Sequence, residues 1–263
     1  MRTAAPVLLA VACLVGGQAS AEPAKTTKPT KAEKAPKFDP KAERVLRDMS
    51  EFLSRQKAFE VEVEGTTDVI MENGQKVQFN REARVSVERP NKVRVDRKGD
   101  LVDAQIYFDG KNITVYAKNA NAYAQRPAPP TIDATVSELY DKFDMDLGPG
   151  DLLAENPAKT LTEDAISGKY LGASTIDGVA TAHLAVRGNE VDWELWVEQG
   201  SRPLPRKYVI TSKKMEGWPQ FSVTLSNWKL VADLPDDTFT FHPPKDAQKI
   251  DFVDQVKKQK GKK

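Results

Sequence analysis

The chain has 263 residues, 40% of them hydrophobic, with a formal net charge of +1 and one cysteine. This length and hydrophobic content suffice for one large domain, and a single cysteine excludes both an internal disulfide framework and a multi-thiolate metal site. Residues 38–252 carry 28 basic and 35 acidic side chains, a net charge of −7 between two lysine-rich ends, which argues against nucleic acid as a partner of this body.

The first 21 residues have the features of a secretory signal peptide. Arg2 precedes an apolar run over residues 4–16, and Ala19-Ser20-Ala21 forms a small-residue cleavage site. The run is too short to span a membrane. Lipid attachment at Cys13 is the alternative, but the residues before it lack the leucine usual in such a site. We therefore expect cleavage near Ala21 and a soluble periplasmic protein.

Residues 22–38 and 253–263 are predicted to be disordered ends. The first is a linker of alternating lysines and prolines, and the second is a basic tail, each with five lysines and little apolar content to bury. Plain solvated linkers are one interpretation. The other is attraction to an anionic membrane surface, at about 1 kcal/mol per lysine.

The folded part is expected to begin with an amphipathic helix over residues 40–57. Asp39 is a suitable N-cap, and Pro40 follows at the first helical position. One face of this helix carries the apolar side chains Val45, Leu46, Met49, Phe52 and Leu53.

Alternation of apolar and polar residues then predicts strands from residue 59 to residue 125, with a turn at Asp109-Gly110. A second helix is predicted from Ile132, because apolar residues recur there at helical spacing, and it ends at Gly148-Pro149-Gly150. Strands resume at 168–176, 179–187, 190–199, 205–214 and 220–232. A closing strand is expected at 237–242.

About eleven antiparallel strands with one apolar face each must cover that face or curl around it. Two amphipathic helices are too few to cover a flat sheet of this size. The predicted fold is therefore mainly β (α+β). It is a strongly curved antiparallel half-barrel with helices on the concave side, formed by a single domain over residues 39–252.

No catalytic or metal-binding motif is recognisable. The two histidines, His183 and His242, are isolated on polar strand faces. Asp144, Asp146 and Glu155 have the spacing of a calcium loop, but proline replaces the glycine that its turn requires. We expect a binding protein that is not an enzyme, with neither cofactor nor metal.

Three motifs resemble the periplasmic lipoprotein-carrier superfamily (LolA/LolB-like). They are Val87-Glu88-Arg89-Pro90-Asn91 leading into a strand, the turn Phe108-Asp109-Gly110-Lys111, and Phe239-Thr240-Phe241-His242-Pro243-Pro244. The chain is most similar to a group of predicted periplasmic proteins of unknown function with that fold. The resemblance spans about residues 40–252 and implies a curved sheet that holds an acyl chain, a lipid or a lipoprotein. It also implies that Arg89 hydrogen-bonds to a helical lid.

A monomeric carrier or receptor for a hydrophobic ligand is therefore the leading functional hypothesis. The alternative is an envelope sensor or interaction module that binds a protein partner without carrying lipid, a function that the same fold also serves. For the carrier, the alternation predicts an apolar lining made by Val61, Phe79, Val85, Val95, Phe108, Val136, Leu139, Phe143 and Trp193. Trp196, which lies among Asp192, Glu194 and Glu198, is expected to be exposed or at a partner surface.

Overall fold

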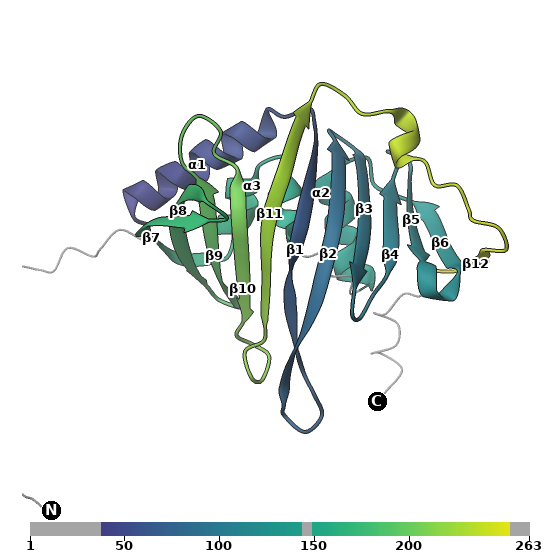
Figure 1. The fold of residues 1–263 in the computed structure, drawn as a ribbon, viewed down its shortest axis with the longest axis horizontal. Coiled ribbons are helices and arrows are strands. Elements are labelled where there is room, and N and C mark those ends of the chain that lie inside the picture. The colour runs from purple at the N-terminus through teal and green to yellow at the C-terminus, as the bar shows by residue number, and fades with distance from the viewer. Residues whose placement is uncertain (1–37, 144–148, 253–263) are drawn as a thin grey trace, which may run out of the picture. The chain divides into compact units, whose positions relative to one another are not determined.

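The computed structural model describes residues 38–143 and 149–252 (Figure 1). The predicted signal peptide, nearly all of the linker, residues 144–148 and the basic tail lie outside the described residues. The linker was predicted to include Phe38, but Phe38 already belongs to the fold. Phe38 forms a β-bridge with Gly168. Its ring packs directly against this glycine, because a Cβ added at Gly168 would lie only 2.3 Å from the nearest ring carbon.

The described residues form one open sheet of twelve strands, in the order β12-β6-β5-β4-β3-β2-β1-β11-β10-β9-β8-β7 (Figure 1). Neighbouring strands are antiparallel except that β12 runs parallel to β6. The prediction of a mainly β, curved and unclosed sheet is confirmed. The strands are β1 (Ala58–Ile70), β2 (Lys76–Glu88), β3 (Lys92–Gly99), β4 (Ala104–Phe108), β5 (Asn112–Ala117), β6 (Ala122–Pro127), β7 (Ala165–Ile176), β8 (Val179–Gly188), β9 (Val191–Glu198), β10 (Pro205–Ser212), β11 (Gln220–Val231) and β12 (Gln248–Ile250).

The helices pack on one face of this sheet (Figure 1). They are α1 (Pro40–Ser54), α2 (Ile132–Phe143) and α3 (Pro157–Thr162), with the short 3-10 helix η2 (Pro149–Leu153). Two further 3-10 helices are η1 (Lys118–Ala120), between β5 and β6, and η3 (Asp236–Phe239), which lies against the opposite face of the sheet. Helix α1 begins as predicted, because the Asp39 carboxylate accepts a hydrogen bond from the Lys41 amide at 2.7 Å and Pro40 follows the cap. It ends three residues before the predicted boundary.

Strand β1 illustrates why the sheet has two different faces. Phe59, Val61 and Val63 are buried on the helix side, while the glutamates between them lie on the opposite, outer face. This period-two alternation follows from the pleat of the strand, which sends successive side chains to opposite sides. The core therefore lies between the apolar face and the helices, and the outer face is polar.

The predicted closing strand over residues 237–242 is wrong. Helix η3 and an extended segment occupy this part of the chain, and the only later strand among the described residues is the short β12. Phe239 is buried, and Phe241 contacts three tyrosine rings of the outer face, from β4, β5 and β6, at centroid distances of 5.0–5.7 Å. The alternation of aromatic and polar residues thus reflects ring packing across the sheet rather than pairing along a strand.

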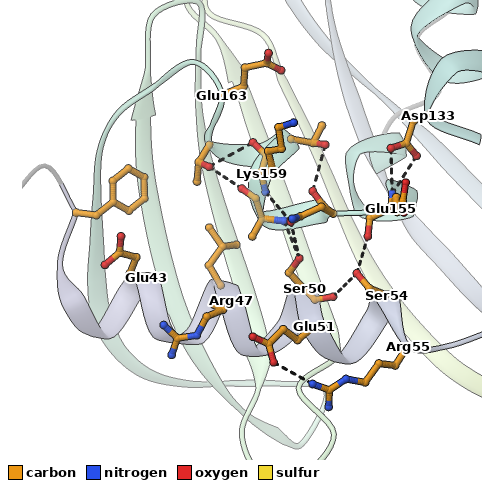
Figure 2. Close-up of a pocket in the computed structure, with 16 residues that line it drawn as sticks. Glu43, Arg47, Ser50, Glu51, Ser54, Arg55, Asp133, Glu155, Lys159 and Glu163 are labelled. Atoms are coloured by element: carbon orange, nitrogen blue, oxygen red, sulfur yellow. Dashed lines mark hydrogen bonds and ion pairs between the residues drawn. The ribbon is translucent and has the colours of Figure 1, made fainter.

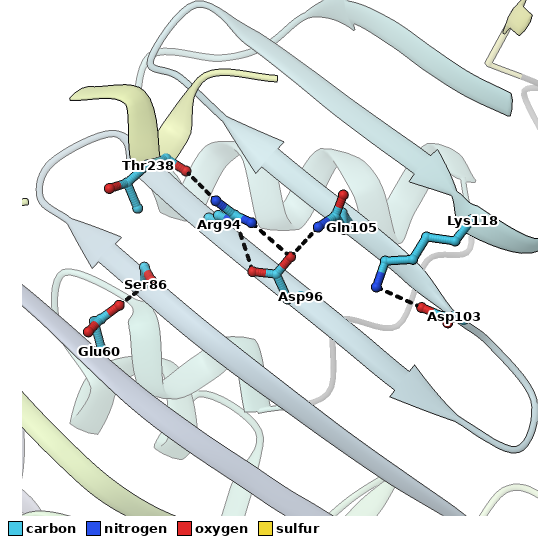
Figure 3. Close-up of polar contacts among 8 residues, drawn as sticks. All are labelled: Glu60, Ser86, Arg94, Asp96, Asp103, Gln105, Lys118 and Thr238. Atoms are coloured by element: carbon cyan, nitrogen blue, oxygen red, sulfur yellow. Dashed lines mark hydrogen bonds and ion pairs between the residues drawn. The ribbon is translucent and has the colours of Figure 1, made fainter. Parts of the chain in front are cut away.

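Polar contacts hold this segment to the outer face. The Arg94 guanidinium, paired with Asp96 on β3, donates to the Thr238 carbonyl at 3.4 Å (Figure 3). Lys92 lies 2.7 Å from Asp236, and the Glu88 carboxylate accepts from the Leu234 amide at 3.1 Å.

Trp196 is not exposed, contrary to the sequence-based expectation. Only 9% of its surface is accessible, because the His183 imidazole stacks on the indole at 3.9 Å and the Lys207 ammonium lies 5.1 Å from the ring. A tryptophan on a polar strand face is here covered by its cross-strand neighbours.

Candidate ligand-binding cavity

An apolar cavity of about 410 Å³ lies between the helix side of the sheet and the segment formed by α2 and η2. Its lining comes from β1 to β5 and β11 on one side and from α2 and η2 on the other. The volume falls within the range of about 300–1,000 Å³ that is usual for small-molecule sites.

Strand register explains the apolar wall. Val61, Val85, Val95, Ile106 and Val115 lie opposite one another on five consecutive strands, so they form a single row across the sheet. Every member of this row lines the cavity. The facing wall is made by side chains of α2 and η2, namely Ile132, Thr135, Val136, Leu139, Leu152 and Leu153.

The structure places six of the nine predicted lining residues on this cavity. They are Val61, Val85, Val95, Phe108, Val136 and Leu139. Their position follows from the two periodicities visible in the sequence, because one face of each strand meets the apolar stripe of α2.

The other three predicted residues lie elsewhere on the apolar side. Phe79 lies six residues along β2 from Val85 and is not among the lining residues, although Thr67, its partner on β1, is. Phe143 packs edge-on against Phe252 at 5.1 Å. Trp193 is buried against Tyr208, on the part of the sheet near β9 and β10.

Several lining residues were not predicted from the sequence. Ile106 and Val115 continue the same alternation and Ile132 the same helical stripe, so the pattern contained a signal for them. Pro149, Gly150 and the leucines of η2 had no such signal, because a single 3-10 turn is too short for a periodic pattern.

Arg89 connects the sheet to η2. Its Nη1 donates to the Leu153 carbonyl at 2.7 Å, while Nε and Nη2 are buried and make no hydrogen bond with any described residue. Burial lowers the pKa of Arg89, and the nearby carboxylates of Asp133 and Glu155 oppose that shift. The resemblance assigned Arg89 to a lid, and the segment it bonds is a wall of the cavity.

The end of η2 is also attached to the helices. The Asp133 carboxylate accepts from the Glu155 amide at 3.0 and 3.1 Å, and the Ser54 hydroxyl donates to the Glu155 carbonyl at 2.7 Å (Figure 2). These bonds join α1, α2 and the residues after η2, so they fix this wall of the cavity relative to the rest of the fold.

A larger hollow of about 1040 Å³ lies along α1 and the residues around α3 (Figure 2). Most of the residues that line it are polar or charged, with side chains of both signs that include Glu43, Arg47, Glu51, Arg55 and Lys159. A polar hollow exposed to water offers little free energy for binding an apolar ligand. The smaller apolar cavity is therefore the candidate functional site.

Neither histidine of the chain lies at this cavity. His183 and His242 lie on the outer side, with their Nε2 atoms 2.8 Å from Glu194 and 2.7 Å from Asp237, respectively. Within residues 38–143 and 149–252, no three His, Cys, Asp or Glu side chains are grouped as metal ligands would be. Among the helices of the same residues, none is long and apolar enough to cross a membrane.

Comparison with known proteins gives one family and several distant relatives. A family model described as "Predicted periplasmic protein (DUF2092)" matches residues 42–253. The chain is 26% identical over 216 residues to an uncharacterized protein of Methanocaldococcus jannaschii, covering 79% of this chain and 53% of that protein. The chain thus spans about half the length of that relative.

Solved structures are similar to this chain at low identity, and two of them illustrate this. An uncharacterized conserved protein from Thermus thermophilus has a TM-score of 0.48 at 15% identity, covering 80% of this chain and 99% of that one. A LolA superfamily protein from Nitrosomonas europaea has a TM-score of 0.36 at 17% identity, covering 76% of this chain and 97% of that one.

Proposed function

The chain belongs to the family of predicted periplasmic proteins (DUF2092), as its motifs indicated, and on this premise we propose that it is a periplasmic binding or carrier protein for a hydrophobic ligand. The ligand is a lipid, or the acyl chain of a lipidated protein. The observation that supports this proposal best is the apolar cavity of about 410 Å³ between the sheet and α2.

The energetics of such a cavity favour an acyl chain. Each buried methylene group contributes about 0.8 kcal/mol, so ten of them contribute roughly 8 kcal/mol before the cost of immobilising the ligand. The proposed site residues are the six predicted residues that line the cavity, together with Ile106, Val115 and the leucines of η2. Arg89 acts as a positioning residue, since its bond to the Leu153 carbonyl holds one wall in place.

A variant that fills the cavity tests this proposal. Val95 lies in the middle of the apolar row, so an indole in Val95→Trp would occupy space that the ligand needs. We expect a fluorescent palmitate analogue to bind this variant at least tenfold more weakly than the wild type. Val231→Trp is the matched control, because Val231 lies at the exposed end of β11, outside the cavity.

Overpacking costs about 1–3 kcal/mol, so both variants are first compared by circular dichroism and urea unfolding. Equal binding of the palmitate analogue by wild type and a folded Val95→Trp variant would show that the cavity is not the binding site.

A further inference from the structure

The cavity has a closed end at β11. This strand contributes two of the described lining residues, Leu225 and Trp228. Beyond β11, no described residue of β7 to β10 or of α1 lines the cavity. That part of the interior is filled, since Met49 of α1, Leu195 of β9 and Tyr208 of β10 are each at most 1% exposed. The cavity therefore stops at β11.

A β-bulge in β11 turns Trp228 toward the cavity. Between two regular pairs with β1, Asn227 and Trp228 lie opposite the single residue Val61, and Asn227 has a φ of 51°, in the left-handed region that asparagine tolerates. Regular alternation from Leu225 would send Trp228 to the outer face, and the extra residue reverses this. The side-chain amide of Asn227 instead donates to the Glu62 carboxylate on the outer face, and the indole lines the cavity.

The indole ends the apolar row of the sheet. Its partner Val61 is the β1 member of the row that runs from β1 to β5. This row consists of valine and isoleucine side chains and ends at a large aromatic ring on β11. From β4 to β11 it crosses four strand spacings, about 19 Å at about 4.8 Å each. On the β3–β4 side the cavity reaches the surface, because Val102 in that loop lines it and is 39% exposed.

Two contacts hold the indole in place. Its Nε1 donates to the Pro205 carbonyl at 3.2 Å, and its ring lies 5.4 Å from the ring of Phe59, which is fully buried. Moving the ring aside would leave the indole N–H and the Pro205 carbonyl unpaired, which is costly in the interior. Trp228 is therefore a fixed stop at this end of the cavity.

The volume of the cavity suits one acyl chain. At roughly 30 Å³ per methylene-sized group, the share of a water molecule in the liquid, a cavity of about 410 Å³ holds about 14 such groups. That number corresponds to a single chain of medium to long length and leaves no room for a second one.

We propose that the site holds a single acyl chain, which enters on the side of Val102, and that Trp228 is the specificity-determining residue that limits its length. This inference rests on the proposed function and specifies its ligand class. Each methylene added below the limit is buried and raises the affinity. A methylene added beyond the limit meets the indole, remains in water and adds nothing.

Competition measurements with saturated fatty acids of 10 to 20 carbons test the inference. Each acid displaces a bound fluorescent palmitate analogue. We expect the affinity of the wild type to rise about fourfold per methylene up to a limiting length and then to stop rising. In Trp228→Leu the limit should move to chains longer by at least two carbons. Dipalmitoyl glycerol should displace the analogue at least tenfold less effectively than monopalmitoyl glycerol does.

Trp228→Leu removes packing as well as volume, so its folding is checked by urea unfolding. If it does not fold, Trp228→Phe, which keeps a ring beside Phe59, is measured in its place and should shift the limit in the same direction. Trp218→Leu is the matched control. Trp218 is an exposed tryptophan in the turn between β10 and β11, outside the cavity, so its loss should leave the limit unchanged.

The outcomes distinguish the inference from the proposed function. If the wild type and a folded Trp228 variant have the same limit, or if the affinity of the wild type rises up to 20 carbons, Trp228 does not limit the chain and the hydrophobic cavity stands. Equal displacement by the one-chain and two-chain glycerides would refute the single-chain site alone. If neither the analogue nor any fatty acid binds the wild type, the proposed function fails and the inference with it.

Discussion

Arg89 lies directly after β2, before Pro90, and its side chain spans from the sheet to η2. Its bond to the Leu153 carbonyl joins two parts of the chain that are 64 residues apart. A hydrogen bond from a charged donor to a partly buried carbonyl contributes more than a neutral one, and the acceptor is left unsatisfied when the donor is removed. This single side chain therefore stabilises one wall of the cavity.

Arg89→Leu should lower the free energy of unfolding by about 1.5–3 kcal/mol and speed the release of a bound fatty acid, because the wall formed by η2 is then less firmly held. Urea unfolding and ligand-displacement kinetics measure the two effects. Arg84→Leu, which removes an exposed ion pair of the outer face, should change stability by less than about 1 kcal/mol. If both variants unfold and release ligand alike, Arg89 is only a surface charge.

For single residues, the sequence predicted which face of the sheet a side chain lies on. It did not predict whether that side chain lines the cavity or is covered by its neighbours. Val85 and Phe79 share one face of β2, and alternation alone cannot tell that the first lines the cavity while the second does not. Trp196 shows the related limit for exposure. Its polar neighbours in sequence suggested contact with solvent, but His183 and Lys207 from adjacent strands cover it. Cross-strand neighbours depend on register, which a single sequence does not specify.

Among the elements, the segment after β11 differs most from its prediction. It was expected to close the sheet as a strand, and it crosses the outer face instead, held there by Phe239, Phe241 and polar contacts. The cause is physical: aromatic residues at every second position pack equally well from an extended strand or from an irregular segment that lies over tyrosines. The long strands and both long helices were predictable because their periodic patterns extend over several turns or pleats.

Glu88 attaches this segment to the sheet in a pH-dependent way. Its carboxylate accepts from the Leu234 amide and from Lys92, and these bonds lower the pKa of Glu88. A carboxylate whose pKa is lower in the folded state contributes stability above its ordinary pKa, about 4.3, and loses that contribution as the pH falls through the folded value.

Glu88→Gln should therefore be less stable than the wild type at pH 7 by about 1 kcal/mol, and the difference should disappear as the pH is lowered from 7 through the folded pKa of Glu88, which lies below its ordinary value of about 4.3. Urea unfolding of both proteins across this range measures it. Glu64→Gln makes the same charge change at an exposed site on β1 and serves as the control. A difference that is constant with pH would mean that the carboxylate charge is not what holds the segment.

For the whole molecule, the sequence specified the architecture but not the cavity. Many strands with one apolar face and few helices require a curved sheet covered on one side, and this is what the described residues form. The same alternation would result from a completely filled interior. Whether space remains between sheet and helix depends on how α2 and η2 pack, and this is not encoded in any periodic pattern.

The charge distribution leads to a prediction about membranes. The lysine-rich segments 22–37 and 257–263, which lie outside the described residues, flank an acidic body. The 22–263 protein should co-sediment with anionic vesicles at low salt more than a 38–252 truncation does. The excess should vanish at 1 M salt, where the Debye length is about 3 Å. Equal co-sedimentation of the two proteins would identify the segments as plain linkers.

Native mass spectrometry of the protein purified from its own periplasm tests the central claim most directly. We predict that the protein carries a co-purified ligand with an acyl chain, and that Val95→Trp, purified in the same way, carries much less of it. A wild-type protein that is free of lipid and bound to a stoichiometric protein partner would contradict the carrier function and support the sensor alternative.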